Sequence, residues 1–402
     1  MTTPSAPLAI ILSGGGARGA YEVGVLSYLF GDYPRATGRM PPIDLVSGTS
    51  VGAINGTYLA SVLDDPIGGI ARLAGLWSSL SLNDVMGFGF RQIAGLPRVL
   101  LGGDAPVGVF DANSMAQLVQ RGIPWRRLAR NLRTGRLRAL IVSVTHVGTG
   151  RSVIYVDAAK GVTVPDDLAA HVIVRREHIR ANHVLASAAI PIVFPAVHIG
   201  GDLYCDGGLR LNTPMAPAIH MGAERLLVVH VATPPAPRGA TPRAVREGRA
   251  PGTPFLLGKV LNAFLLDHVS TDVAHVREVN QLLELGTTVC GGGFVDRINA
   301  EAARRGARAR RIIRTLSVRP TVDIGSLAGD HLRRNRARFG RFLGRSLLRA
   351  LDVGEGADAD LASYLLFDGE FTRQVVELGR SDAAAKRDEL DDFLFPTDAA
   401  ET

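Results

Sequence analysis

Two glycine-rich segments near the N-terminus carry residue types that can hold or attack a reacting group. The first is GGGARG at 14–19, and the second is GTSVG at 48–52. The first segment offers bare backbone amides, which suit either the pyrophosphate of a dinucleotide or the oxyanion of an acyl-transfer reaction. The second offers a serine hydroxyl between two glycines. Which chemistry applies depends on the elements that position these segments.

The serine segment has the context of a nucleophile elbow. We expect an apolar strand at 43–46 and a helix at 51–62, with Ser50 in the turn between them. A serine in such a turn adopts a strained backbone conformation, so the residues two positions away must be small, as Gly48 and Gly52 are. The N-terminus of the helix also directs its amides and positive dipole toward the serine oxygen. This context favours Ser50 as a nucleophile.

The glycine loop follows another expected strand, 8–12. A dinucleotide site needs an acidic residue at the end of the next strand, but Asp44 begins that strand and Ser50 follows its end. Loops after neighbouring parallel strands meet at one edge of a sheet, which places the amides of 14–16 beside Ser50. We therefore favour an oxyanion hole over a dinucleotide site.

The serine needs a proton acceptor, and two kinds are available. A histidine oriented by a carboxylate is the usual base, although no histidine here lies in a distinctive local pattern. Asp206, in the sequence CDGG, ends a short expected strand before two glycines. A carboxylate in that position can accept the proton directly, and the alternative is an ordinary turn. The histidines that stay open as the base are His146, His171, His178, His183, His198, His220 and His230.

The rest of the pattern predicts strands that alternate with helices. A helix is expected at 20–30, a hairpin at 139–147 and 152–156, and a short helix that ends at Pro191. A tight turn at 200–201 precedes DLYCDGG, and ERLLVVHVA indicates a further central strand. This alternation predicts an α/β layered domain.

Length and composition fit one large globular unit or two ordinary ones. The chain has 402 residues, of which 46% are hydrophobic and 21% are charged. We expect a core at 1–232, a Pro/Arg-rich linker or loop at 233–254, and a mainly helical region at 255–402 that packs on or completes the core. Within the core, the apolar segment 66–108 forms either a cap or part of the interior. The acidic residues after 381 are expected to form a solvated tail.

The formal net charge of +7 is compatible with an anionic partner, either a membrane surface or a nucleic acid. It is equally compatible with a basic surface that is only solvated. In 332–351 arginines recur on one helical face opposite Phe339 and several leucines. An interfacial membrane helix has this pattern, and so does a surface helix packed on the core. The arginine-rich segment 304–320 has little aromatic interleaving, so we expect no nucleic-acid partner.

Only two cysteines occur, without the spacing of a zinc site, which argues against a disulfide scaffold and a metal. The N-terminus lacks the pattern of a signal peptide, and no apolar segment approaches the roughly 20 residues of a membrane span. We therefore expect a cytoplasmic protein without metal or cofactor that makes peripheral contact with anionic membranes. The sequence leaves the oligomeric state open.

Three segments together resemble the patatin-like phospholipase family: GGGARG at 14–19, GTSVG at 48–52 and DGG at 206–208. The segment ASAAIPIVFP at 186–195 is also similar to the stretch before that family's catalytic aspartate. The resemblance covers at least 8–232. It implies a three-layer α/β/α sandwich with a mostly parallel central sheet, and an enzyme that hydrolyses acyl esters of phospholipids or related lipids, of the phospholipase A or lysophospholipase type.

The resemblance also implies a role for each motif residue. Ser50 would be the nucleophile and Asp206 the general base of a Ser–Asp dyad, which works without histidine through an acyl-enzyme. The implied oxyanion hole consists of Gly14, Gly15, Gly16 and Arg18. The glycines that support the motifs are Gly19, Gly48, Gly52, Gly207 and Gly208. The alternative functions are an acyltransferase on the same dyad and a NAD(P)-binding oxidoreductase that uses the loop 14–19.

Overall fold

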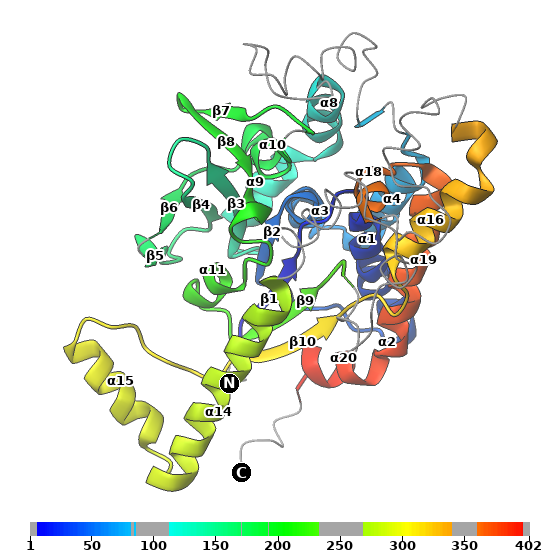
Figure 1. Cartoon of the computed structure of the whole chain (residues 1–402). Helices are drawn as coiled ribbons and strands as arrows, with labels where there is room; N and C mark the ends of the chain where they lie inside the picture. Colours follow the sequence, from blue (N-terminus) through cyan, green and yellow to red (C-terminus); the bar gives the residue numbers. More distant parts are fainter. Residues whose placement is uncertain are drawn as a thin grey trace, which may run out of the picture.

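One central sheet with helices on both of its faces forms the body of the molecule (Figure 1). The computed structural model describes residues 6–81, 84–85, 112–169, 171–191, 193–232, 268–339 and 360–396. The strands in these residues are β1 (Leu8–Leu12), β2 (Leu45–Thr49), β3 (Ala139–His146), β4 (Ser152–Ala158), β5 (Asp167–Ala169), β6 (Val172–Arg176), β7 (Val197–Ile199), β8 (Asp202–Asp206), β9 (Arg225–Val229) and β10 (Arg314–Val318).

The order of these strands is β10-β9-β1-β2-β3-β4-β6-β5, and β8 pairs with β3 and with β7. Five contiguous strands, from β10 to β3, are parallel to one another. The pairs β3–β4 and β3–β8 are antiparallel, so the predicted hairpin is confirmed. The predicted sandwich with a mostly parallel central sheet is confirmed as well.

Helices cover both faces of the sheet (Figure 1). The longer ones that the structure describes are α1 (Ala20–Ser27), α3 (Val51–Val62), α4 (Pro66–Ser79), α8 (Ala112–Gly122), α9 (Trp125–Arg133), α14 (His268–Cys290), α15 (Phe294–Arg304), α16 (Ile324–Arg334), α19 (Gly369–Ala385) and α20 (Arg387–Leu394). The shorter ones are η1 (Gly16–Gly19), η2 (Tyr28–Asp32), α2 (Tyr33–Thr37), α10 (Ala181–Ser187), η3 (Gly207–Leu209), α11 (Met215–His220) and α18 (Asp360–Leu365).

The core lies on both faces of the sheet, as β1 shows. Leu8, Ile10 and Leu12 belong to one cluster of buried side chains, and Ala9 and Ile11 belong to the other. Successive side chains of a strand point to opposite faces, so a strand buried on both faces must be apolar at every position. This requirement explains why β1 is a continuous apolar segment rather than an alternating one.

Three element boundaries differ from the predicted ones. β2 runs from Leu45 to Thr49 instead of 43–46, because the polar residues of the motif still pair with β3 through their backbones. The helix expected at 20–30 ends as an α-helix at Ser27 and continues as the π-helical turn η2. α10 ends at Ser187 rather than at Pro191, because Ala188 already leaves the helical conformation, with φ −99° and ψ 5°.

The C-terminal region completes the sheet and packs against the N-terminal helix. β10 extends the sheet beyond β9, and α19 lies against α1. Two glycines allow this approach, because a Cβ on Gly24 would lie 2.0 Å from the Val376 carbonyl oxygen and one on Gly379 2.2 Å from that of Tyr21. The expected solvated tail is wrong for Asp382, which is buried and accepts hydrogen bonds from Tyr21.

Other expectations fall partly or wholly outside the described residues. The linker 233–254 does so entirely, so the division at 1–232, 233–254 and 255–402 stays a prediction. In the apolar segment 66–108, α4 contributes Leu73 and Trp77 to the core. Phe88 and Phe90 are not among the residues that the structure describes. Of the amphipathic segment 332–351, the structure describes only residues 332–339. Within this part, α16 ends at Arg334.

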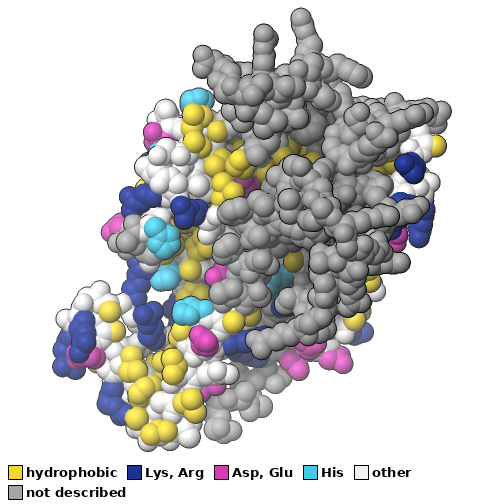
Figure 2. Space-filling view, viewed as in Figure 1, with side chains coloured by type: hydrophobic (Ala, Val, Ile, Leu, Met, Phe, Trp, Pro, Cys, Tyr) yellow, Lys and Arg dark blue, Asp and Glu magenta, His cyan; other side chains and the backbone are white. Residues whose placement is uncertain are grey.

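A helical hairpin formed by α14 and α15 projects from the body (Figure 1). Asn280 anchors it at the start of β10, where its side chain hydrogen-bonds the backbone of Ile313 in both directions. Beyond this anchor, Leu282, Leu285 and Val289 form an exposed hydrophobic patch (Figure 2). In the part of the chain that the structure describes, no helix is both long enough and apolar enough to span a bilayer.

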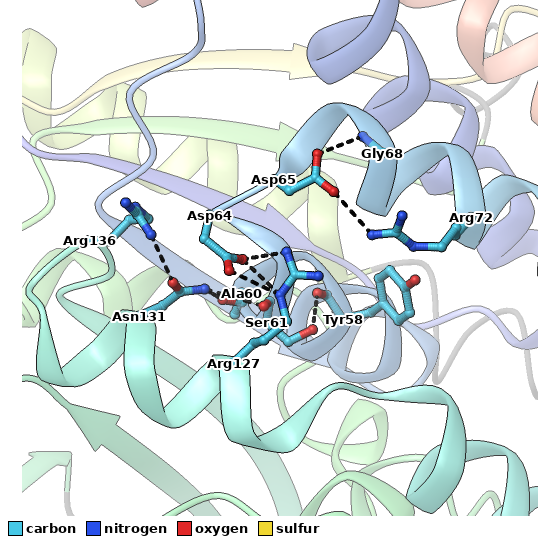
Figure 3. Close-up of polar contacts among 10 residues, drawn as sticks. All are labelled: Tyr58, Ala60, Ser61, Asp64, Asp65, Gly68, Arg72, Arg127, Asn131 and Arg136. Atoms are coloured by element: carbon cyan, nitrogen blue, oxygen red, sulfur yellow. Dashed lines mark hydrogen bonds and ion pairs between the residues drawn. The ribbon is translucent and has the colours of Figure 1, made fainter.

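The C-terminal end of α3 is fixed by polar contacts with α9 and α4 (Figure 3). The Asn131 side chain donates to the Ala60 carbonyl at 2.9 Å, and the Arg127 guanidinium binds the Asp64 carboxylate. The Asp65 carboxylate accepts from the Gly68 amide and so caps α4. These contacts hold the C-terminal end of the helix whose N-cap is Ser50.

Candidate active site

Ser50 occupies a strained turn between β2 and α3. Its φ is +56°, and it is the only described non-glycine residue with a positive φ. The turn is crowded, because a Cβ on Gly48 would lie 2.3 Å from the Gly52 carbonyl oxygen and one on Gly52 2.4 Å from that of Leu12. The two glycines are therefore required by close backbone contacts. This geometry is that of a nucleophile elbow, in which a non-glycine residue holds a strained backbone conformation.

The hydroxyl of Ser50 donates a hydrogen bond to Asp206, with Oγ 2.6 Å from Oδ2. Asp206 ends β8, whose antiparallel pairing with β3 aligns it with Val144. Its other carboxylate oxygen accepts from the Gly208 amide at 2.7 Å, and the Thr145 hydroxyl donates to its carbonyl oxygen. The fold thus brings together two residues that the sequence separates by 156 positions.

Burial controls the charge of Asp206. The side chain has no exposed surface, and desolvation raises the pKa of its carboxyl group to about 7, against the smaller opposing effects of the Ser50 and Gly208 hydrogen bonds. The group is therefore half ionised near neutral pH. A general base works best when its pKa lies near the working pH, so this carboxylate suits proton transfer better than an exposed one.

No described histidine hydrogen-bonds to Ser50 or to the Asp206 carboxylate. The buried ring of His183 contacts Glu177 instead, and that of His230 contacts Ser317. Among the described contacts of Ser50, Asp206 supplies the acceptor.

The glycine loop lies beside Ser50, as the order of the strands requires. A Cβ on Gly14 would lie 3.0 Å from the Ser50 Cβ. The Gly14 amide donates to the Asn212 side-chain oxygen at 3.0 Å, so it is already engaged. Gly16 has a φ of +57° and lines the same cavity as Ser50. In the described part of the chain, the amides of Gly15 and Gly16 form no hydrogen bond.

The side chain of Arg18 is buried beneath the C-terminal region. Its Nε donates to the Ser363 hydroxyl at 2.7 Å, and its guanidinium lies 4.4 Å from the centre of the Tyr364 ring. Arg18 is not among the described residues that line the cavity. Arg18 therefore joins the glycine loop to α18.

A cavity of about 660 Å³ opens beside Ser50. α3, α4, α8 and α18 contribute to its walls together with the segment after α10. Most of the described lining is apolar, as with Leu73, Trp77, Met115 and Phe194. An apolar cavity of this size beside a hydroxyl nucleophile fits a hydrocarbon chain attached to the reacting group.

Two residues support the site through contacts that the sequence did not reveal. The Ser187 hydroxyl accepts from the Ser50 amide at 2.9 Å and donates to the Ser143 carbonyl oxygen at 2.6 Å, so it fixes the turn. Asn212 holds the glycine loop through Gly14. Both lie close to recognised motifs, but nothing in their local sequence indicates that their side chains reach the backbone of distant loops.

The cluster of His331, Asp368 and Glu370 brings three candidate ligand atoms within 4.8 Å of one another, and it is the only such described group. The Asp368 carboxylate already accepts from the His331 ring at 3.1 Å and from Arg338, and it caps α19. The Arg338 guanidinium also pairs with Glu370. These contacts give the cluster a structural role in attaching α16 to α19.

The sequence model of the patatin-like phospholipase family matches residues 10–219. None of the curated proteins is matched. Among solved structures, VipD from Legionella pneumophila is 13% identical, with 96% of this chain and 67% of that chain covered and a TM-score of 0.38.

The complex of ExoU with SpcU from Pseudomonas aeruginosa gives 16% identity, with 90% and 68% of the two chains covered and a TM-score of 0.24. These likenesses to solved structures are distant, and the family match carries the assignment. It covers more than half of the chain and includes both glycine-rich segments and Asp206. The chain therefore belongs to the patatin-like phospholipase family, a family of lipid ester hydrolases.

Proposed function

We propose that the protein is a serine lipid acyl hydrolase in which Ser50 is the nucleophile and Asp206 the general base. The observation that carries this proposal is the 2.6 Å contact between Ser50 Oγ and Asp206 Oδ2 beside an apolar cavity of about 660 Å³. The proposed nucleophile, its proton acceptor and a cavity that can hold an acyl chain therefore lie next to one another. Phospholipids and lysophospholipids are the proposed substrates.

In the acylation step, Ser50 Oγ attacks the ester carbonyl carbon and its proton passes to the Asp206 carboxylate. The tetrahedral intermediate collapses, and the leaving alcohol takes the proton from Asp206. In the second step, water gives a proton to Asp206 and attacks the acyl-enzyme. The fatty acid leaves, and the proton returns to Ser50. Base catalysis of this kind contributes about 10²- to 10⁴-fold.

The backbone amides of Gly15 and Gly16 are the proposed oxyanion donors. Both lie in the loop beside Ser50, whereas the Gly14 amide is bound to Asn212 and the Arg18 side chain is bound to Ser363. Each well-placed donor stabilises an oxyanion by roughly 3–4 kcal/mol. Within the predicted oxyanion hole, Gly14 and Arg18 thus act as supports of the loop.

We also propose that 1–232 forms the catalytic core and that 255–402 completes it. β10 extends the sheet, and Tyr364 both lines the cavity and covers the Arg18 side chain. A chain shortened to 1–232 would expose α1 and one wall of the cavity. We therefore expect the shortened chain to lack a stable fold and esterase activity.

Contact with anionic membranes is part of the proposal. The net charge of +7 supports it, and so does the exposed patch of Leu282, Leu285 and Val289, which lies on the same hairpin as exposed Arg304 and Arg305. The hairpin leads into the N-terminal end of β10, at the opposite end of the parallel strands from Ser50, so it would act as a tether. Sedimentation with phosphatidylglycerol vesicles at low salt, and its loss at high salt, would support this role.

The decisive experiment is labelling with a fluorophosphonate, followed by peptide mapping. We expect the label on Ser50, and we expect S50A to lose at least 10³-fold in hydrolysis of a short p-nitrophenyl ester. Ser27→Ala is the matched control, because Ser27 bonds only within its own helix, to the Val23 carbonyl. A label on another residue, or activity retained in S50A, would refute the proposal.

A lipid panel then identifies the substrate class. Phosphatidylcholine, lysophosphatidylcholine and triacylglycerol should be offered to wild type and S50A, with free fatty acid as the measured product. Release of fatty acid from the phospholipids, abolished in S50A, supports the proposed substrates. Release from triacylglycerol alone would contradict them. Transfer of the acyl group to an added alcohol in preference to water would identify an acyltransferase.

A further inference from the structure

A buried polar chain connects the glycine loop with the wall of the cavity. The Asn55 side-chain amide donates to the Gly19 carbonyl oxygen at 3.0 Å and to Glu22 Oε2 at 2.8 Å. Its side-chain oxygen accepts from Trp77 Nε1 at 3.1 Å. Asn55 and Glu22 have no exposed surface, and Trp77 lines the cavity.

Glu22 is the unusual member of this chain. No described cation contacts its carboxyl group, and its second oxygen, Oε1, has no hydrogen-bond partner. Desolvation raises the pKa of the group well above its ordinary value, although Asn55 and the nearby backbone amide of Ser13 favour the ionised form. A carboxamide at this position has the same shape and keeps an oxygen that can accept the Asn55 hydrogen bond.

Asn55 binds the C-terminal end of the glycine loop, and Glu22 holds the Asn55 amide that makes this bond. Ser13, beside Glu22, directly precedes Gly14, and Gly19, bound by Asn55, is the last residue of η1. Glycine gives the intervening backbone no intrinsic preference for one conformation. A loop of this kind holds its amides in place only if its ends are fixed by the surrounding structure.

We propose that Glu22 is a positioning residue that, by holding the Asn55 side chain, clamps the Gly19 end of the oxyanion loop and couples it to Trp77 in the cavity wall. This inference rests on the proposed function, because it takes the loop amides to be oxyanion donors. The clamp acts on the reaction through the loop, since Glu22 itself does not line the cavity.

The test compares two substitutions of Glu22 that fill the same space. Glu22→Gln keeps an acceptor for Asn55 and should retain kcat within about 3-fold. Glu22→Met removes the acceptor, and we expect it to lower kcat for p-nitrophenyl butyrate by about 100-fold, the lower end of the loss that follows removal of one oxyanion donor. KM should change by less than about 3-fold, because the clamp acts in the transition state.

Asn131→Ala is the matched control for loss of a buried polar group. Asn131 is also fully buried and also bonds a backbone carbonyl, but it supports the far end of α3. We expect N131A to lose stability while the folded enzyme keeps its kcat. Equal losses of kcat in N131A and E22M would overturn the proposal, because the effect would then be general destabilisation.

Trp77 provides a readout independent of activity. The chain has two tryptophans, so Trp125→Phe leaves the Trp77 indole as a single NMR reporter. In that background, E22M should shift the indole N–H resonance and E22Q should leave it in place. If E22M does not fold, Asn55→Leu is the second variant, because it removes the hydrogen bonds of Asn55 to Gly19 and to Trp77. It should shift the same resonance and lower kcat.

The outcomes separate this inference from the function on which it rests. If fluorophosphonate does not label wild-type Ser50, the proposed function fails. If wild type is labelled and hydrolyses the ester, and E22M does both equally well, the hydrolase stands and the clamp is refuted. An unchanged indole resonance in folded E22M refutes the coupling to Trp77.

Discussion

The burial of Asp206 predicts an unusual effect of substitution on stability. Asp206→Asn should abolish hydrolysis, because an amide cannot accept the Ser50 proton, and yet it should stabilise the fold at neutral and alkaline pH. The physical reason is desolvation. An ionised carboxylate without any exposed surface and without a cationic partner is costly, whereas a neutral amide of the same shape is not.

The magnitude follows from the pKa of Asp206, which rises from its ordinary value of 3.8 to about 7. Between these values the folded protein holds a proton that the unfolded chain has lost, so stability falls as the pH rises through this window. The loss amounts to about 2 kcal/mol at pH 5 and about 4 kcal/mol at pH 8. Removing the carboxylate should recover these amounts, which are large beside a typical total of about 5–15 kcal/mol.

The assay is urea unfolding of wild type and D206N at pH 5 and pH 8, followed by circular dichroism. The stabilisation by D206N should be about 2 kcal/mol greater at pH 8 than at pH 5. Asp202→Asn, at the exposed start of the same strand, is the control and should change stability by less than about 0.5 kcal/mol at either pH. A D206N protein that is no more stable than wild type at pH 8 would refute the account of desolvation.

Three further predictions follow from the same structure. Ester hydrolysis should rise with pH through a midpoint near 7, because Asp206 must be ionised to accept a proton, and a flat profile from pH 5 to 8 would contradict this. Gly52→Ala should disrupt the elbow and lower Tm, while Gly75→Ala, which meets nothing within 4 Å, should stabilise α4 by about 0.5–1 kcal/mol. Asp382→Ala should lower the free energy of unfolding by about 2–3 kcal/mol in urea titrations, because it leaves the Tyr21 hydroxyl without its acceptor.

The sequence was sufficient for the parts of the site whose chemistry is local. The elbow at Ser50 is defined by five consecutive residues that span the end of β2 and the start of α3, and its glycines are required by contacts within a few ångströms. Asp206 could be proposed only together with the other motifs, because an aspartate before two glycines is by itself an ordinary turn. The strand order then explains why the glycine loop lies beside Ser50.

The supports of the site depend on contacts that no local pattern contains. Gly14 is bound by a side chain 198 residues away, and Arg18 by one 345 residues away. The family resemblance implies a place for Arg18 in the oxyanion hole, whereas its buried side chain is bound to Ser363 beneath α18. Asp382 was expected in a solvated tail because acidic residues are usually exposed, whereas two hydroxyl donors hold it in the interior.

The proton affinities of Asp206 and of the serine hydroxyl explain why a carboxylate base needs a firmly held glycine loop. Burial brings the pKa of Asp206 up to about 7, close to that of the histidine in a conventional triad. The serine hydroxyl is far less acidic, and a lone carboxylate becomes neutral when it takes the proton, so no imidazolium forms to offset the developing negative charge. In the proposed mechanism that charge is stabilised by the backbone amides of the glycine loop. A site of this type therefore depends on the rigidity of its loop more than a triad does, which is why the buried contacts of Glu22 and Asn55 should influence kcat.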